Sequence, residues 1–209
     1  MREHKSLKDN RYGSEKMKYD IVLASASPRR IEMFKNNGYE VKVMPADIEE
    51  NLPKDIKATD AVMFLALKKA LHIEEKLLEK GIDNDTLIVA ADTVVAFEDR
   101  ILGKPENEKD AFDMLSKLNG NVHYVATGVA LLVAGKQNGR VFYDKTYVEV
   151  LKYTDEDIYE YIASGEPMDK AGAYAIQGGF GKYVKEYRGS YSNIVGFPWG
   201  KFQEELKKL

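Results

Sequence analysis

The chain has 209 residues, of which 44% are hydrophobic and 31% are charged, a composition typical of a globular protein. Its formal net charge of −3 argues against a general nucleic-acid binder. It has no cysteine and three histidines, which excludes disulfides, thiolate metal sites, a cysteine nucleophile and a histidine-rich metal centre, so any metal would be a hard cation on oxygen ligands. No apolar run approaches the roughly 20 residues of a membrane span and no signal-peptide segment precedes the first strand, so we expect a cytoplasmic protein that does not contact membranes.

The first 18 residues are polar, charged and aperiodic, and we predict a flexible N-terminal tail over 1–18 followed by a single domain over 19–209. A buried strand is predicted over Asp20–Ala24. Ser27 stands at an N-cap position with Pro28 after it, which predicts a helix that ends at Gly38. A helix N-terminus favours anions, and Arg29 and Arg30 would add two guanidinium groups that match phosphate oxygens. The alternative is an ordinary capped helix with surface arginines.

The next segments predict a strand over Tyr39–Met44, an acidic loop over Ala46–Lys54, and a long helix over Thr59–Lys80 with Thr59 as its cap and Gly81 as its stop. Thr86–Ala90 reads as a short buried strand that ends directly at Asp92, followed by a hairpin over Thr93–Leu102.

A helix is then predicted over Asn107–Leu118, strands over Val122–Val150 with a turn at Gly135–Gly139, and a helix over Thr154–Ala163 that begins with a capping box. The glycine-rich segment Ala171–Val184 predicts a loop and hairpin, and Pro198 the start of a terminal helix. Strands, hairpins and helices interleave without strict repetition, which predicts an α/β fold with a mixed sheet flanked by helices on both sides.

Asp92 is the strongest single candidate for chemistry. It follows a buried strand, at a place where open α/β sheets carry functional groups, and a carboxylate in so apolar a context needs a cation, a metal or a water as its partner. The alternative is an aspartate that caps a turn between strands.

Four further sites are candidates, and all but Lys104 have a plain structural alternative. Glu49 and Glu50 could hold Mg²⁺ together with substrate phosphates, although most acidic pairs in loops are only solvated. Of Lys68 and Lys69, one must lie near the apolar face of the long helix, where it either reaches a buried anion or snorkels to solvent.

Lys104 follows a strand and precedes a proline that holds the loop extended. Gln177 offers a donor and an acceptor suited to the edge of a base, although the adjacent glycines alone would indicate only a turn. His72 and His123 are interpreted as structural.

These residues together describe a cationic cradle facing carboxylates, which suits metal-assisted attack of water on a polyphosphate. The cradle would consist of Arg29, Arg30, Lys69 and Lys104, and the carboxylates of Asp92, Glu49 and Glu50. Spacing does not choose the substrate or the phosphorus attacked. No phosphate-binding P-loop, HExxH zinc motif or nucleophile elbow is present.

Several ordered strings resemble the Maf family of nucleotide pyrophosphatases. They are LASASPRR, the IEE of the acidic loop, AADTVV, LGKP, TGVAL, EPMDKAGAYAIQG and VGFP, and they run in the same order from about Tyr19 to the C-terminus. The resemblance implies a two-lobed fold similar to the inosine-triphosphate pyrophosphatases, with the active site in the cleft between the lobes. It also implies hydrolysis of a nucleoside triphosphate to the monophosphate and pyrophosphate, with Mg²⁺, Mn²⁺ or Co²⁺ as cofactor.

By the same resemblance, Asp92 corresponds to the general base, and Glu50 to an acidic residue that handles metal and water, so Glu50 and Asp92 are the expected metal ligands. Phosphate binding is implied for Ser25, Arg29, Arg30, Lys69 and Lys104. Arg29, Thr93 and Gln177 match positions that distinguish substrate subgroups, and the combination resembles the subgroup acting on dTTP and UTP, with modified pyrimidine nucleotides as a further option.

The resemblance further implies a homodimer, and roles in nucleotide-pool housecleaning and cell-division arrest. Two departures from the family pattern, Ala175 and the run Phe197–Trp199, bear on fine substrate preference. Two other hypotheses remain at this point: a nucleotide-binding regulator of septum formation without turnover, and a nucleic-acid-binding module. The net charge of −3 disfavours the second, and the carboxylates Asp92 and Glu50 disfavour the first, because they would oppose polyphosphate binding without a metal.

Overall fold

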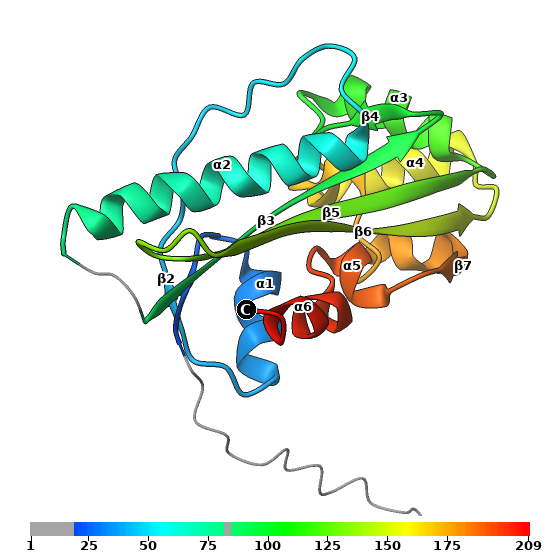
Figure 1. The fold of residues 1–209 in the computed structure, drawn as a ribbon. Coiled ribbons are helices and arrows are strands. Elements are labelled where there is room, and N and C mark those ends of the chain that lie inside the picture. Colours follow the sequence, from blue (N-terminus) through cyan, green and yellow to red (C-terminus); the bar gives the residue numbers. More distant parts are fainter. Residues whose placement is uncertain (1–18, 82–84) are drawn as a thin grey trace, which may run out of the picture.

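A seven-stranded mixed sheet forms the centre of the molecule (Figure 1). The computed structural model describes residues 19–81 and 85–209, so the predicted tail over 1–18 lies outside the described residues. The strands are β1 (Asp20–Leu23), β2 (Val41–Val43), β3 (Thr86–Phe97), β4 (Arg100–Leu102), β5 (Val122–Val133), β6 (Gly139–Val150) and β7 (Val184–Arg188). Their order is β2-β1-β3-β5-β6-β7, with β4 paired to the end of β3. β1 runs parallel to β2 and β3, and all other pairs are antiparallel.

Strand β3 is much longer than its neighbour β1, and this mismatch opens a gap in the sheet. β1 pairs with β3 only as far as Val89, and β4 begins to pair at Val95. Between these positions β3 keeps β5 on one side, with Asp92 opposite Gly128, and has no paired strand on the other among the described residues. Backbone groups on that edge must therefore find partners outside the sheet.

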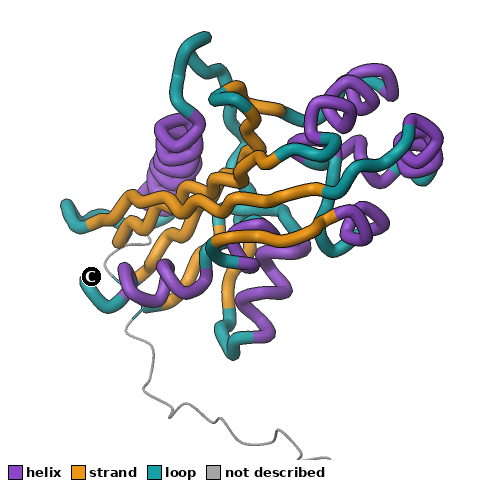
Figure 2. Tube along the Cα trace, turned by 90° about the vertical axis from the view of Figure 1, so that its right-hand side faces the viewer, coloured by secondary structure: helices purple, strands orange, loops and turns teal. Residues whose placement is uncertain are grey.

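The helices cover both faces of the sheet and one end of it (Figures 1 and 2). They are α1 (Pro28–Asn36), α2 (Ala58–Leu78), α3 (Glu108–Leu118), α4 (Asp155–Ala163), α5 (Tyr191–Val195) and α6 (Trp199–Leu206), with 3₁₀ turns η1 (Glu166–Asp169), η2 (Ala171–Ala173) and η3 (Gly179–Tyr183). Figure 1 shows α2 along one face of the long strands, α1, α5 and α6 on the opposite face, and α3 and α4 toward the end where β4 and β7 lie.

The buried side chains divide into clusters that match these groups. One cluster joins α3, α4 and the 3₁₀ turns around Phe180 and Leu115. At the other end of the strands, a cluster around Phe34 and Phe202 packs α1 and α6 on one face, and a cluster around Ile73 packs α2 on the other. The expected α/β fold, a mixed sheet flanked by helices in two lobes, is confirmed.

Several local predictions are also confirmed. Glu98 and Asp99 both have positive φ in a two-residue turn between β3 and β4, as a tight hairpin requires. The capping box at the start of α4 is present, with the Thr154 hydroxyl accepting from the Asp157 amide and the Asp157 carboxylate accepting from the Thr154 amide.

Other local predictions are wrong. β3 does not end at Asp92 but continues to Phe97, because the residues over 94–97 are again apolar on both faces. Helix α2 begins after Lys57 and not after the predicted cap Thr59. Ser27 is the N-cap of α1 with Pro28 after it, as predicted, but its side chain makes no cap bond. The segment 171–184 folds as 3₁₀ turns and the start of edge strand β7 in place of a hairpin, because Gly172 and Ala173 take left-handed backbone angles.

None of the helices in the described parts of the chain has both the length and the apolar character needed to cross a bilayer.

Candidate active site

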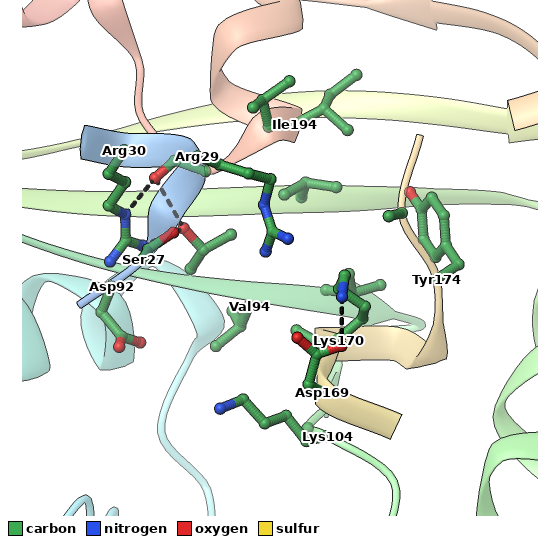
Figure 3. A pocket seen from close by; sticks show the side chains of 18 of the residues that line it. Ser27, Arg29, Arg30, Asp92, Val94, Lys104, Asp169, Lys170, Tyr174 and Ile194 are labelled. Atoms are coloured by element: carbon green, nitrogen blue, oxygen red, sulfur yellow. Dashed lines mark hydrogen bonds and ion pairs between the residues drawn. The ribbon is translucent and has the colours of Figure 1, made fainter. Parts of the chain in front are cut away.

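The gap beside β3 opens into a cleft of about 640 Å³ between the two lobes. Its walls come from the β1–α1 turn, the middle of β3, the loop after β4, the η1–η2 segment and the end of α5. Figure 3 shows side chains that line the cleft. Eight residues that the sequence singled out line it: Arg29, Arg30, Glu50, Lys69, Asp92, Thr93, Lys104 and Gln177. Ser25 is buried beneath the lining, where its hydroxyl accepts hydrogen bonds from the Ser27 amide and Arg30.

Consecutive residues of β3 face opposite sides of the sheet, and this alternation separates two groups of polar side chains. Asp92 lies on the same side as Ile88 and Ala90, which pack against α2. Thr93 lies on the same side as Val89 and Ala91, which pack toward α1 and α6. We call the first group (Asp92, Lys69 and Glu50) the ionic face, and the second (Arg30, Thr93, Thr127 and Asn193) the bonded face.

Lys69 holds the ionic face together. It falls four residues after Leu65 and four before Ile73 on the buried stripe of α2, so the helix turns its side chain toward β3. Its Nζ lies 2.6 Å from Asp92 Oδ1 and 2.7 Å from Glu50 Oε1. The side chains of Lys69 and Asp92 are 13% and 12% exposed, whereas that of Glu50 is 55% exposed. The Lys69–Asp92 pair is thus fixed between helix and strand, and Glu50 reaches it from a surface loop.

The ionic face has the donor set that a hard divalent cation prefers. The Lys69 ammonium shows that a positive charge between the two carboxylates is favourable there, and Mg²⁺ is commonly bound by one or two carboxylates together with substrate phosphates and water. Within residues 19–81 and 85–209, no group of three or more acidic, histidine or cysteine side chains gathers as a ready metal cage. A cation held by Glu50 and Asp92 would therefore need ligands from a bound phosphate.

The bonded face is centred on Arg30, whose guanidinium donates to four acceptors. Nε donates to the Gly196 carbonyl at 2.8 Å, and Nη1 to the Ala91 carbonyl at 2.8 Å and to Ser25 Oγ at 3.2 Å. Nη2 donates to Thr93 Oγ1 at 2.9 Å. Burial is the largest influence on this guanidinium and lowers the pKa of Arg30, while the charge of Asp92 acts to raise it.

Behind Arg30 the hydrogen bonds continue into the core. Thr93 Oγ1 lies 2.9 Å from Thr127 Oγ1, which donates to the Asn193 carbonyl. Asn193 Nδ2 donates to the Val125 carbonyl and to Thr146 Oγ1, both at 3.0 Å. Thr127 and Asn193 are completely buried, so this network is shielded from water and links α5 to the sheet.

Arg29 and Lys104 differ from Arg30 in having no internal partner. Neither guanidinium nor ammonium forms a hydrogen bond or ion pair with any residue of the described chain, although both line the cleft. In Figure 3 a dashed line ends on Arg30 and none ends on Arg29 or Lys104. Their donors are available to an anionic ligand.

Glu166 supports the loop that carries Gln177. Its carboxylate accepts from the Tyr161 hydroxyl at 2.9 Å and from the Gly179 amide at 3.0 Å. A Cβ on Gly178 would lie only 1.6 Å from Glu166 Oε1, so a larger residue here would displace the Glu166 carboxylate. Burial, with Glu166 beside it, raises the pKa of Tyr161 and keeps its hydroxyl protonated as a donor.

A neighbouring, more open cavity of about 340 Å³ shares Arg29, Gln177 and Val195 with the cleft and is otherwise lined by α1, α5 and Trp199. Arg29 and Gln177 therefore stand where the two spaces meet.

Some candidates lie elsewhere. Glu49 does not line the cleft, and its backbone carbonyl accepts from Lys68 Nζ at 2.6 Å near the surface. His123 is buried with Nε2 at 2.7 Å from the Tyr174 hydroxyl, in agreement with a structural role.

Sequence reasoning missed two lining residues, Asp169 and Lys170, which form an ion pair at the η1–η2 junction. Hydrogen bonding from Lys170 lowers the pKa of Asp169. A signal was available, because an adjacent acid and base stand directly before the small residues Ala171–Ala173. The Gly196 carbonyl was also missed, since a backbone acceptor leaves no trace in residue type.

Comparisons with known proteins identify the family of this chain. The model of the family described as Maf-like protein matches residues 20–209. The dTTP/UTP pyrophosphatase of Agathobacter rectalis is 45% identical over 199 residues, covering 90% of this chain and 97% of the relative. Proteins with the same name from Caldicellulosiruptor saccharolyticus and Bacillus cereus are 42% and 41% identical over 189 residues, covering 90% of this chain and 94% and 95% of the relatives.

Among solved structures, the Staphylococcus aureus Ham1 protein aligns with a TM-score of 0.45 and 16% identity, over 63% of this chain and 71% of that chain.

Proposed function

This chain belongs to the Maf family, and we propose that it hydrolyses dTTP and UTP to the nucleoside monophosphate and pyrophosphate. The observation that carries the proposal is the cleft itself. It sets the Asp92 and Glu50 carboxylates, joined by Lys69, opposite the unpaired cations Arg29 and Lys104. The names of the relatives support the choice of pyrimidine triphosphates.

Arg29 and Lys104 are the donors that the proposal assigns to the phosphate chain. A triphosphate brings several negative charges into a cleft that already contains three carboxylates, those of Glu50, Asp92 and Asp169, so binding needs cations that are not already paired. Arg29 offers a planar fork for two phosphate oxygens and Lys104 a point charge. Both lie in the cleft wall with their polar ends reaching into the open space (Figure 3).

Asp92 is assigned as the general base. Its Oδ1 accepts from Lys69, which orients the carboxylate, and its Oδ2 has no hydrogen bond to any described residue. As a water oxygen forms its bond to the α-phosphorus, Oδ2 accepts the water proton, and the bond from the α-phosphorus to the bridging oxygen of pyrophosphate breaks. General-base help of this kind contributes about 10²–10⁴-fold.

Glu50 and Asp92 are also the residues that would hold a divalent cation, as the ligand types of the ionic face allow. Such a cation supplies charge stabilisation to the phosphoryl oxygens when bound. Lys69 keeps a positive charge beside both carboxylates and so limits their repulsion of the triphosphate.

Gln177 is assigned to the nucleobase. Its amide offers one donor side and one acceptor, which matches the carbonyl and N–H pattern shared by uracil and thymine. Glu166 and Gly178 hold the loop in place, so the amide is presented from a rigid support.

The experiment that tests this proposal is product analysis by ion-pair chromatography with Mg²⁺ and a nucleotide panel. The panel contains dTTP, UTP, CTP, GTP, 7-methyl-GTP and ITP, and the Asp92→Asn protein, purified in the same way, controls for contaminating phosphatases. We expect monophosphate and pyrophosphate from dTTP and UTP with the unmodified protein only.

Nucleoside diphosphate and phosphate would contradict attack on the α-phosphorus. A preference for purine nucleotides would contradict the role given to Gln177. Binding without turnover, with any nucleotide and divalent metal, would replace the enzyme with a nucleotide-binding regulator.

A further inference from the structure

Arg29 and Arg30 are adjacent in sequence and carry the same charge, yet their surroundings differ completely. Arg30 has four acceptors within 3.2 Å, all of them belonging to the protein and all of them uncharged. Arg29 has no hydrogen-bonded or ion-paired partner in the part of the chain that the structure describes. Both side chains line the same cleft, but the pair that the sequence presents as one double-arginine phosphate site differs in its hydrogen bonding.

One acceptor of Arg30 is a backbone carbonyl that a neighbouring strand would otherwise bind. β1 ends opposite Val89 and β4 begins opposite Val95, so the Ala91 carbonyl lies on the unpaired edge of β3. A buried carbonyl without a donor costs about 1–3 kcal/mol. Arg30 Nη1 fills the place of the missing strand at 2.8 Å from that oxygen.

The same guanidinium binds the residues on either side of Asp92. It contacts the backbone carbonyl of Ala91 and the side chain of Thr93 on β3, and it reaches the Gly196 carbonyl at the end of α5. The two residues that flank the general base are thereby fixed to the first turn of α1 and to α5. A guanidinium has five N–H groups, and these four contacts leave one of them for any ligand.

We propose that Arg30 is a positioning residue that holds the Asp92 segment of β3, and that Arg29 alone of the two arginines binds the phosphate chain. The inference rests on the proposed function, because it assigns roles within that reaction. It changes the role that the family resemblance implied for Arg30, from phosphate ligand to support of the catalytic strand.

The lysine variants of the two arginines form a matched pair, because each keeps the positive charge and removes the fork of donors. In Arg30→Lys a single ammonium cannot reach acceptors on β3, the β1–α1 turn and α5 together. We expect kcat for dTTP to fall about 100-fold, the effect of a misplacement of about 1 Å at a reacting group, with KM within about threefold of the unmodified value.

In Arg29→Lys we expect the opposite split. KM for dTTP and the inhibition constant of inorganic pyrophosphate rise about tenfold, the loss of one bidentate charge-assisted contact, and kcat stays within about threefold. Arg30→Lys leaves the inhibition constant of pyrophosphate unchanged. A merely structural role for Arg30 would lower the folded fraction and the apparent kcat together, so active-site titration accompanies each kcat.

A second measurement uses the unmodified protein and needs no turnover. The Nε–H groups of the arginines are observed by NMR with ¹⁵N-arginine labelling, before and after addition of pyrophosphate, and assigned with the two lysine variants. We expect the Arg29 signal to shift and the Arg30 signal to be protected from exchange and to keep its position.

Weakened pyrophosphate inhibition in Arg30→Lys, equal to that in Arg29→Lys, would overturn the proposal, and so would an Arg30 signal that shifts with pyrophosphate. If no nucleotide is hydrolysed, the proposed function fails while the NMR experiment still decides between the two arginines.

Discussion

The two faces of β3 hold their polar groups in different ways. On the ionic face two carboxylates meet around the Lys69 ammonium, and one of them, Glu50, is 55% exposed on a loop. On the bonded face Arg30, Thr93, Thr127 and Asn193 are joined by hydrogen bonds to neutral acceptors, many of them in backbone. Ionic contacts can exchange partners when a nucleotide and a cation arrive, whereas a buried network of hydrogen bonds resists rearrangement.

The reactive carboxylate and the first residue of the rigid hydrogen-bond network are therefore neighbours on one strand. Asp92 faces α2 and the charges, and Thr93 faces α1 and the network. Changes on the ionic face should therefore affect turnover more than stability. Changes in the part of the bonded face behind Arg30, at Thr127 and Asn193, should affect stability first.

The largest effect is expected from Asp92→Asn, which breaks the ionic face. The amide cannot accept the water proton as a carboxylate does, so we expect kcat for dTTP to fall by about 100-fold or more. Lys69 keeps its contact with Glu50, and the thermal midpoint should change little. Steady-state kinetics and calorimetry on the same preparation check both parts, and near-normal turnover would remove Asp92 from its role.

Gly128→Ala tests the packing that brings the ionic face together. Gly128 lies opposite Asp92 in β5, and a Cβ there would meet the Val62 carbonyl group of α2 at 2.3 Å. Because the close atoms are backbone, the helix must move, at an expected cost of about 3 kcal/mol in unfolding free energy. Urea unfolding measures it, with Gly103→Ala as control, since no atom lies within 4 Å of a Cβ at Gly103. Equal midpoints for the two variants would contradict the close approach.

The pH dependence of stability tests the surroundings of the bonded face through His123. This residue lies on the same face of β5 as Thr127 and contacts Tyr174 of the cleft wall. Burial lowers the pKa of His123 from 6.5 to about 4. Between these values the unfolded chain binds a proton that the folded chain does not, so stability falls as pH falls. From pH 7 to pH 5 we expect a loss of about 2 kcal/mol from this residue.

The control for that pH dependence is His123→Gln, which can retain a hydrogen bond to Tyr174 but does not titrate. Its unfolding free energy should fall by about 2 kcal/mol less than that of the unmodified protein over the same interval. An identical pH dependence in both proteins would show that His123 does not contribute.

Thr127→Val is expected to give the smallest effect, and it separates an effect on stability from an effect on turnover. The substitution keeps the side-chain shape and removes a hydroxyl that contacts Thr93 and donates to the Asn193 carbonyl. Unpaired buried groups should lower the unfolding free energy by about 1.5 kcal/mol. Turnover per folded molecule should stay within about threefold, in contrast to Asp92→Asn, and a 100-fold loss without destabilisation would erase the distinction between the faces.

The sequence predicted the ionic face better than the bonded face, for a physical reason. Lys69 stands out as a charge on an apolar helical stripe, and Asp92 as a carboxylate within a buried strand, so local pattern identifies both. Arg30 is equally visible, but its acceptors include backbone carbonyls at Ala91 and Gly196, and the second lies 166 positions away. Neither the chemistry of a carbonyl nor its distance in space is encoded in residue type.

The prediction that β3 stops at Asp92 was wrong for a related reason. A carboxylate within an apolar run usually marks the end of burial, but here Lys69 supplies the partner that lets the strand continue to Phe97. The gap between β1 and β4, which creates the cleft, depends on the relative lengths of three strands, and local pattern does not give strand pairing.

The most direct test of the central claim is hydrolysis of dTTP in water enriched in ¹⁸O, followed by mass spectrometry of both products. Attack of an Asp92-bound water on the α-phosphorus predicts one labelled oxygen in dTMP and unlabelled pyrophosphate. Label in the pyrophosphate with unlabelled dTMP would place the attack on the β-phosphorus and contradict the arrangement of carboxylates and cations proposed for this cleft.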